Sequence, residues 1–95
     1  MKTEERLKLY GKAISTWGEI PQVFMLYEET GELAEAMAKY MRGRYNENEV
    51  ITELADVYIM VEQMASMLNF NKFEEEKERK LLRLQERLDK DSKKE

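Results

Sequence analysis

The sequence contains neither cysteine nor histidine. Without cysteine the chain cannot form disulfides or thiolate metal sites, and without histidine it has no zinc–histidine site, Ser-His-Asp triad or histidine general base. Any metal ion must therefore be held by oxygen ligands. The same absence counts against a four-helix carboxylate di-iron protein, because such sites use Glu-x-x-His pairs on two of their helices.

Turn-forming residues are also scarce, with one proline and four glycines in 95 residues. This composition favours helices and leaves little turn material for a sheet. Apolar residues make up 42% of the chain, which is enough for a globular core. A chain this short nevertheless buries only about two-thirds of the surface that its unfolded form exposes. We therefore expect one all-α domain over residues 1–95, with a thin core of its own.

Positive charge is in deficit, because the formal net charge is −4. An acidic chain lacks the basic surface that binding to a nucleic acid polymer requires. The N-terminal residues show no apolar signal region, and no run approaches the roughly 20 apolar residues of a membrane span. We expect a cytoplasmic protein without a nucleic acid polymer or a membrane as its partner.

Hydrophobic periodicity predicts four helices, over residues 3–14, 22–42, 46–68 and 71–90. Thr3 is the expected N-cap of the first helix. Residues 15–21, which include the only proline, are expected to form a connector. Residues 91–95 are expected to be a frayed, charged tail.

Glycine and asparagine mark the ends of the middle helices. Gly43 is a typical residue at the C-terminal end of a helix. Asn46 with Glu49, and Asn71 with Glu74, have the spacing of a capping box, which predicts the starts of the third and fourth helices.

The two middle helices carry apolar residues on every side, at residues 23–27 and 57–61. A helix that is apolar all round is normally buried. Because 95 residues can hardly surround two such helices, we expect a homodimer or homotetramer with these helices at its centre. The predicted fold is a four-helix antiparallel bundle completed by oligomerisation.

Each of these apolar helices also contains two acids three residues apart, Glu29 with Glu32 and Glu53 with Asp56. Residues at this spacing share one side of a helix. None of the positions three or four residues away from these acids holds lysine or arginine. Local salt bridges therefore cannot explain the two pairs.

Unpartnered acids are costly in such helices. Burying an unpaired carboxylate costs several kcal/mol. Two helices packed side by side would aim four carboxylates at one point, and a hard cation with oxygen ligands would compensate for them. Mg²⁺ fits this ligand set, and four carboxylates could hold two or more ions.

The acidic segments, EETGELAEA over residues 28–36 and ELADV over residues 53–57, resemble the metal signature of the MazG-like, all-α NTP pyrophosphohydrolases. The resemblance covers roughly residues 17–83 and is most specific in these two motifs. The short length and the continuation DVYIM over residues 56–60 are similar to the compact, phage- or prophage-type members.

This resemblance implies cleavage of nucleoside triphosphates to the monophosphate and pyrophosphate, in a role of nucleotide-pool house-cleaning. It implies a dimer or a dimer of dimers, and Mg²⁺, or Mn²⁺ in its place, held by Glu29, Glu32, Glu53 and Asp56. With no histidine available, a carboxylate is the expected general base. Glu29 and Glu32 are both candidates for orienting the attacking water.

Basic residues of the last helix are implied to steady the departing pyrophosphate, in a Lys-x-x-Arg arrangement. Lys80 and Arg83 stand at that spacing, with Lys77 and Arg79 as neighbours. Family members often carry a lysine shortly before the second acidic motif, where this chain has Glu49. Its substitutes would be Lys39 and Arg42.

Trp17 is the best candidate for contacting the nucleotide base, although a role as a core residue stays open. Gln22 is a candidate for reading a base edge. The alternative function is a non-catalytic helical module that keeps the fold for oligomerisation or partner binding. A coiled-coil adaptor would need heptads through the tail, where the apolar stripe is too short.

Overall fold

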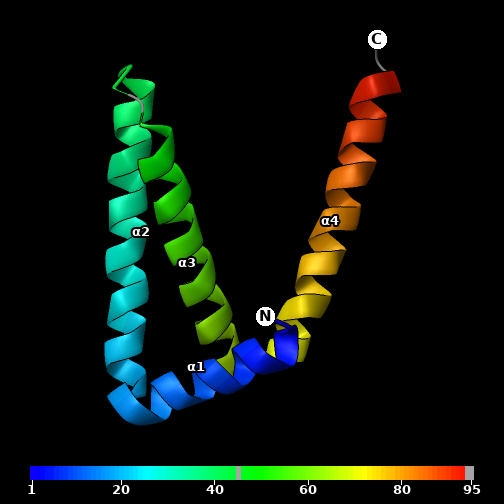
Figure 1. The fold of residues 1–95 in the computed structure, drawn as a ribbon. Helices are drawn as coiled ribbons and strands as arrows, with labels where there is room; N and C mark the ends of the chain where they lie inside the picture. Colours follow the sequence, from blue (N-terminus) through cyan, green and yellow to red (C-terminus); the bar gives the residue numbers. More distant parts are fainter. Residues whose placement is uncertain (45, 94–95) are drawn as a thin grey trace.

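Four helices make up the chain in the computed structural model, which describes residues 1–44 and 46–93. Figure 1 shows α1 (Thr3–Trp17), α2 (Glu19–Met41), α3 (Glu47–Leu68) and α4 (Phe70–Lys93). The described residues contain no strand. The predicted all-α class is therefore confirmed.

The centre of the molecule is an antiparallel hairpin of α2 and α3, as expected (Figure 1). Helix α1 crosses the lower end of this hairpin and contacts both of its helices. Among the described residues, α4 contacts α3 alone, and it then rises away from the hairpin. One face of α2 and α3 therefore lacks the fourth helix that a closed bundle would place there.

The connector between the first two helices is much shorter than the predicted seven residues. Gly18 alone separates α1 from α2. Its φ is 93°, a backbone angle that residues other than glycine rarely adopt. Pro21 lies in the first turn of α2, where a missing amide hydrogen is tolerated. The proline therefore starts a helix here and does not mark a loop.

The capping predictions were correct for α3 and wrong for α4. Asn46 accepts a hydrogen bond from the backbone N–H of Glu49, as predicted. The corresponding contact at α4 comes from Asn69, whose side chain accepts from the N–H of Lys72, so this helix begins before Asn71. Asn69 also ends α3, so one residue separates the two helices.

The outer helix ends differ from the prediction in smaller ways. Helix α1 begins at Thr3 itself, and Lys2 precedes it without a side-chain cap. Gly43 follows the last turn of α2 with a φ of 76°, which suits a glycine after a helix end. Helix α4 continues to Lys93, and the last two residues of the predicted tail lie outside the described residues.

The core of the single chain is thin, as expected from its length. The buried apolar residues are Tyr10, Ala36, Met60 and Ala65. Beside them Glu62, which is 3% exposed, accepts hydrogen bonds from Tyr10 Oη at 2.7 Å and Arg6 Nε at 2.9 Å. These bonds attach α1 to α3 through a satisfied buried charge.

The apolar middle helices are not covered within one chain. Phe24 and Tyr27 of α2 are 63% and 78% exposed, and Tyr58 of α3 is 58% exposed. Large aromatic side chains in such number are normally buried. The sequence predicts that these two helices are buried. A surface outside the single chain would therefore have to cover them.

Candidate functional site

Three of the four predicted acids come together between α2 and α3. One carboxylate oxygen from each of Glu29, Glu53 and Asp56 lies within 4.8 Å of the others. Glu29 comes from α2, and the other two come from adjacent turns of α3. The three-residue spacing on α3 and the antiparallel packing of the hairpin together produce this meeting of carboxylates.

Glu32, the fourth acid, stands one turn beyond Glu29 at the more exposed edge of the group. After burial, its charge is the largest cause that raises the pKa of both Glu29 and Glu53, so it belongs electrostatically to the same centre. We call Glu29, Glu32, Glu53 and Asp56 the acid centre.

Two carboxylate oxygens of the acid centre are buried without a hydrogen-bond partner among the described residues, Oε2 of Glu29 and Oε2 of Glu53. Burial is the first cause that raises the pKa of these two carboxyls, and repulsion by Glu32 and Asp56 is the second. An unpaired buried carboxylate oxygen is a costly feature that native proteins rarely keep without a purpose. The oxygens are available to a ligand.

No lysine or arginine of the described residues forms an ion pair with the acid centre. Lys39, a suggested phosphate contact on α2, lies 3.4 Å from Glu49 and 4.0 Å from Glu35. Its ammonium group is therefore already compensated by carboxylates. The centre is a set of oxygen ligands with excess negative charge, which suits a hard divalent cation.

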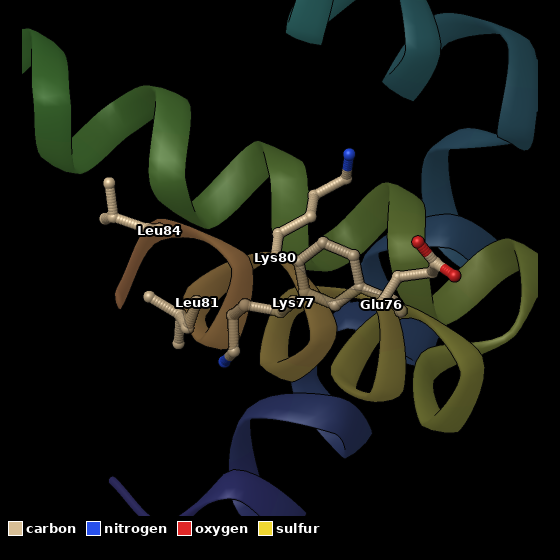
Figure 2. A pocket seen from close by; sticks show the side chains of 6 residues that line it. Glu76, Lys77, Lys80, Leu81 and Leu84 are labelled. Carbon is tan, nitrogen blue, oxygen red and sulfur yellow. The ribbon is translucent and has the colours of Figure 1, made fainter. Parts of the chain in front are cut away.

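The basic residues predicted to bind phosphate lie on α4, away from the acid centre of their own chain (Figure 1). Lys77 is paired with Glu74 at 2.9 Å, whereas Lys80 and Arg83 form no ion pair with a described residue. Lys77 and Lys80 lie one turn apart on the same side of α4 and line a shallow cavity of about 420 Å³ with Leu81 and Leu84. Their ammonium groups point away from each other (Figure 2). Lys80 and Arg83 are exposed, and their charged groups form no ion pair with a described residue.

The two residues predicted to contact the nucleotide base lie near each other, at the end of the α2–α3 hairpin that α1 crosses. Trp17 lines a cavity of about 470 Å³ between α1 and α3, together with Tyr10 and Ile59. Gln22 is buried on α2 and accepts a hydrogen bond from Nε2 of Gln63, which also lines this cavity. Trp17 and Gln22 thus reach one region from different helices.

Gln63 was missed by the sequence reasoning, although a signal for it exists. Gln63 follows Asp56 by seven residues on α3, and Gln22 precedes Glu29 by seven residues on α2. Seven residues are nearly two full turns, so each glutamine shares a helix side with an acid. Extending the acid periodicity along both helices would have placed the two glutamines opposite each other.

A sequence model of the MazG nucleotide pyrophosphohydrolase domain matches residues 22–87, more than half of the chain. This match includes all four residues of the acid centre and the predicted phosphate contacts Lys77, Lys80 and Arg83. No curated protein and no solved structure matches the chain. None of the described helices combines the length and the apolar character that crossing a membrane would take.

Proposed function

The chain belongs to the MazG nucleotide pyrophosphohydrolase family, and on this basis we propose that it hydrolyses nucleoside triphosphates to the monophosphate and pyrophosphate. The observation that carries the proposal is the acid centre, with its unpartnered buried carboxylate oxygens. A nucleotide-pool house-cleaning role in the cytoplasm is part of this proposal.

The acid centre fits Mg²⁺, with Mn²⁺ as a substitute. Glu29, Glu53 and Asp56 would hold the first ion, because their oxygens already converge, and Glu32 would join them or hold a second. Bound Mg²⁺ would neutralise the triphosphate, polarise the α-phosphate and lower the pKa of a nearby water molecule. The donor set consists of oxygen ligands and has no basic partner within residues 1–44 and 46–93, which supports this assignment.

A carboxylate of the acid centre acts as the general base in this proposal. Glu29 and Glu32 lie on the same side of α2, one turn apart, and either can accept the proton of the attacking water. Burial and like charge raise the pKa of the Glu29 carboxyl, which strengthens it as a proton acceptor. Glu32 is the more exposed of the two and so the easier for water to reach.

Lys80 and Arg83 bind the departing pyrophosphate in this proposal, and they do so from a second copy of the chain. Within one chain α4 leads away from the hairpin, and its bases have no route to their own acid centre (Figure 1). Only three basic residues lie between Gly18 and Asn71, all near the tip of the hairpin: Lys39, Arg42 and Arg44. A homodimer or homotetramer would bring α4 of one copy to the phosphates held by another.

The test is release of pyrophosphate from a panel of ribo- and deoxynucleoside triphosphates, with and without Mg²⁺. We expect equimolar monophosphate and pyrophosphate, with activity lost in EDTA and restored by Mg²⁺ or Mn²⁺. Absence of pyrophosphate release across the panel would favour the alternative, a non-catalytic helical module that keeps the fold for oligomerisation or partner binding. Release of orthophosphate would show cleavage at a different bond.

A further inference from the structure

The cavity between α1 and α3 carries a polar group that the acid centre does not use. Its walls are largely apolar and aromatic, with Tyr10, Ala13, Trp17 and Ile59 among them. Gln63 lines the same cavity and is only 5% exposed. Lys12 and Thr16 also line it. Proteins commonly orient small ligands in this way, with a few polar groups in a largely apolar pocket.

Gln22 determines which end of the Gln63 amide is free. Nε2 of Gln63 donates a hydrogen bond to Oε1 of Gln22, and Nε2 of Gln22 donates to Sδ of Met25 at 3.6 Å. A thioether sulfur accepts but cannot donate, so Met25 keeps the amino end of Gln22 toward itself and the oxygen toward Gln63. No donor within residues 1–44 and 46–93 reaches Oε1 of Gln63. This oxygen is an acceptor that a ligand can use.

The glutamine pair lies at a suitable distance from the acid centre. The spacing of seven residues from Glu29 to Gln22, and from Asp56 to Gln63, corresponds to about 10 Å along each helix. Because α2 and α3 are antiparallel, both spacings run in the same direction, toward α1. A nucleotide whose phosphates lie at the acid centre would extend its sugar and base along this path. Ile59, one turn from Asp56, marks the near edge of the cavity.

We propose that this cavity binds the nucleotide base and that Gln63 selects cytosine over uracil and adenine over hypoxanthine, through the exocyclic amino group that replaces an oxo group in each pair. An amino group donates to the free oxygen of Gln63, whereas an oxo group would set two acceptors against each other. Trp17 supplies an aromatic face for stacking. Gln22 is a positioning residue, because it acts through Gln63. The inference rests on the proposed function, which places the phosphates at the acid centre.

Binding can be followed without metal or turnover, because Trp17 is the only tryptophan of the chain. Its fluorescence is titrated with CMP against UMP, and with AMP against IMP. The members of each pair differ in the exocyclic amino or oxo group and in the adjacent ring nitrogen, which is an acceptor beside the amino group and an N–H donor beside the oxo group. We expect the amino member of each pair to bind about tenfold more tightly to the wild-type protein. Equal affinities within both pairs, or a preference for the oxo member, would overturn the inference.

Three variants assign the preference to the glutamine pair. Gln63→Met keeps the size of the side chain and removes the acceptor, so the ratio within each pair should fall to about one. Gln22→Met frees the Gln63 amide to turn and should reduce the ratio in part. Gln85→Met, at an exposed position on α4, is the matched control and should leave the ratio unchanged. An unchanged ratio in folded Gln63→Met would contradict the assignment, and the wild-type titrations decide if that variant does not fold.

Turnover separates this inference from the proposed function. The ratio of kcat/KM for CTP and UTP is measured with Mg²⁺ in the wild-type protein and in the Gln63→Met variant. Pyrophosphate release without any base preference would leave the proposed function standing and refute the role of Gln63. A CMP preference in the metal-free titration without any pyrophosphate release would support the base pocket and refute the hydrolase.

Discussion

Among the single residues, those of the acid centre lower the stability of the metal-free fold while providing the ligands for a cation. Its carboxylates are close together, partly buried and without basic partners among the described residues. Glu29 and Glu53 therefore destabilise the metal-free fold through desolvation and like-charge repulsion, which raise the pKa of both carboxyls. Such a loss of stability is typical of a ligand-binding site. A ligand that binds these carboxylates in the folded state stabilises the fold on binding.

Neutral amide substitutions test this balance. We expect Glu53→Gln and Asp56→Asn each to reduce turnover at least about 100-fold, because each weakens metal ligation. The metal-free variants should unfold at the same or a higher temperature than the wild-type protein, since a buried like charge is removed. Steady-state pyrophosphate release and thermal melts measure both effects. Glu78→Gln, an exposed acid on α4, is the control, and near-wild-type turnover in both site variants would sink the mechanism.

The pH dependence of Mg²⁺ stabilisation follows from the raised pKa values of Glu29 and Glu53. A carboxyl with a raised pKa in the fold contributes stability below its unfolded pKa and loses it as the pH rises through the folded pKa. The metal-free protein therefore loses this contribution as the pH climbs above about 4.5. Because Mg²⁺ binds the ionised carboxylates, its effect on Tm should be larger at about pH 7.5 than at about pH 5. An equal shift at both values would contradict metal binding at these acids.

Glu62 provides an internal contrast at low pH. Its hydrogen bonds to Arg6 and Tyr10 lower the pKa of its carboxyl, although burial opposes them. A lowered carboxyl pKa contributes stability above the unfolded pKa that is lost as the pH falls through the folded value. Glu62 therefore contributes to the loss of stability in strong acid, as does Glu76, whose pKa its hydrogen bond to Arg79 lowers. The raised pKa values of Glu29 and Glu53 contribute instead to the loss above about pH 4.5.

The sequence predicted the acid centre better than it predicted the polar groups around it. Acid pairs three residues apart, without nearby bases, are visible in one helix at a time. The bond between Gln22 and Gln63 joins residues 41 positions apart, and the bond between Arg6 and Glu62 joins residues 56 apart. Such pairs depend on the register and crossing of two helices, which local spacing does not determine.

At the scale of elements, the starts of α3 and α4 can be tested with one type of substitution. Asn46→Ala and Asn69→Ala each remove an acceptor from a helix N-terminus and should each cost about 1 kcal/mol of folding stability. Asn71→Ala should change stability by less than about 0.5 kcal/mol, because Asn71 lies inside α4 and its side chain caps no helix among the described residues. Chemical denaturation measures all three, and a larger loss for Asn71→Ala than for Asn69→Ala would contradict the observed start of α4.

Helix positions were predictable because periodicity and capping act within a few residues. The predicted connector over residues 15–21 was wrong because proline is compatible with a first helical turn. Only Gly18 separates α1 from α2. The direction of α4 was not predictable in this way. A helix with apolar residues at Phe73, Leu81, Leu84 and Leu88 must pack somewhere, but that pattern does not say against which surface.

At the scale of the whole molecule, the single chain is too open for its size. It exposes 7947 Å², whereas a folded monomer of this mass exposes about 5,800 Å². Its radius of gyration is 16.7 Å, against about 12 Å for a compact chain of 95 residues. The excess of about 2,100 Å² per chain matches the loss expected when obligate subunits associate.

We therefore expect the chain to fold as a homodimer or homotetramer. Burying a large apolar side chain contributes roughly 1.5–3 kcal/mol, so leaving Phe24, Tyr27 and Tyr58 exposed would forgo much of a typical stability margin of about 5–15 kcal/mol. Light scattering at micromolar concentration should give two or four times 11.4 kDa, and the Tm should fall on dilution. Phe24→Glu places a charge among these apolar residues and should shift the mass toward the monomer. Because Lys80 and Arg83 would then no longer reach a second copy's acid centre, pyrophosphate release should fall with the mass, and an active 11.4 kDa monomer would refute the assembly but not the metal site.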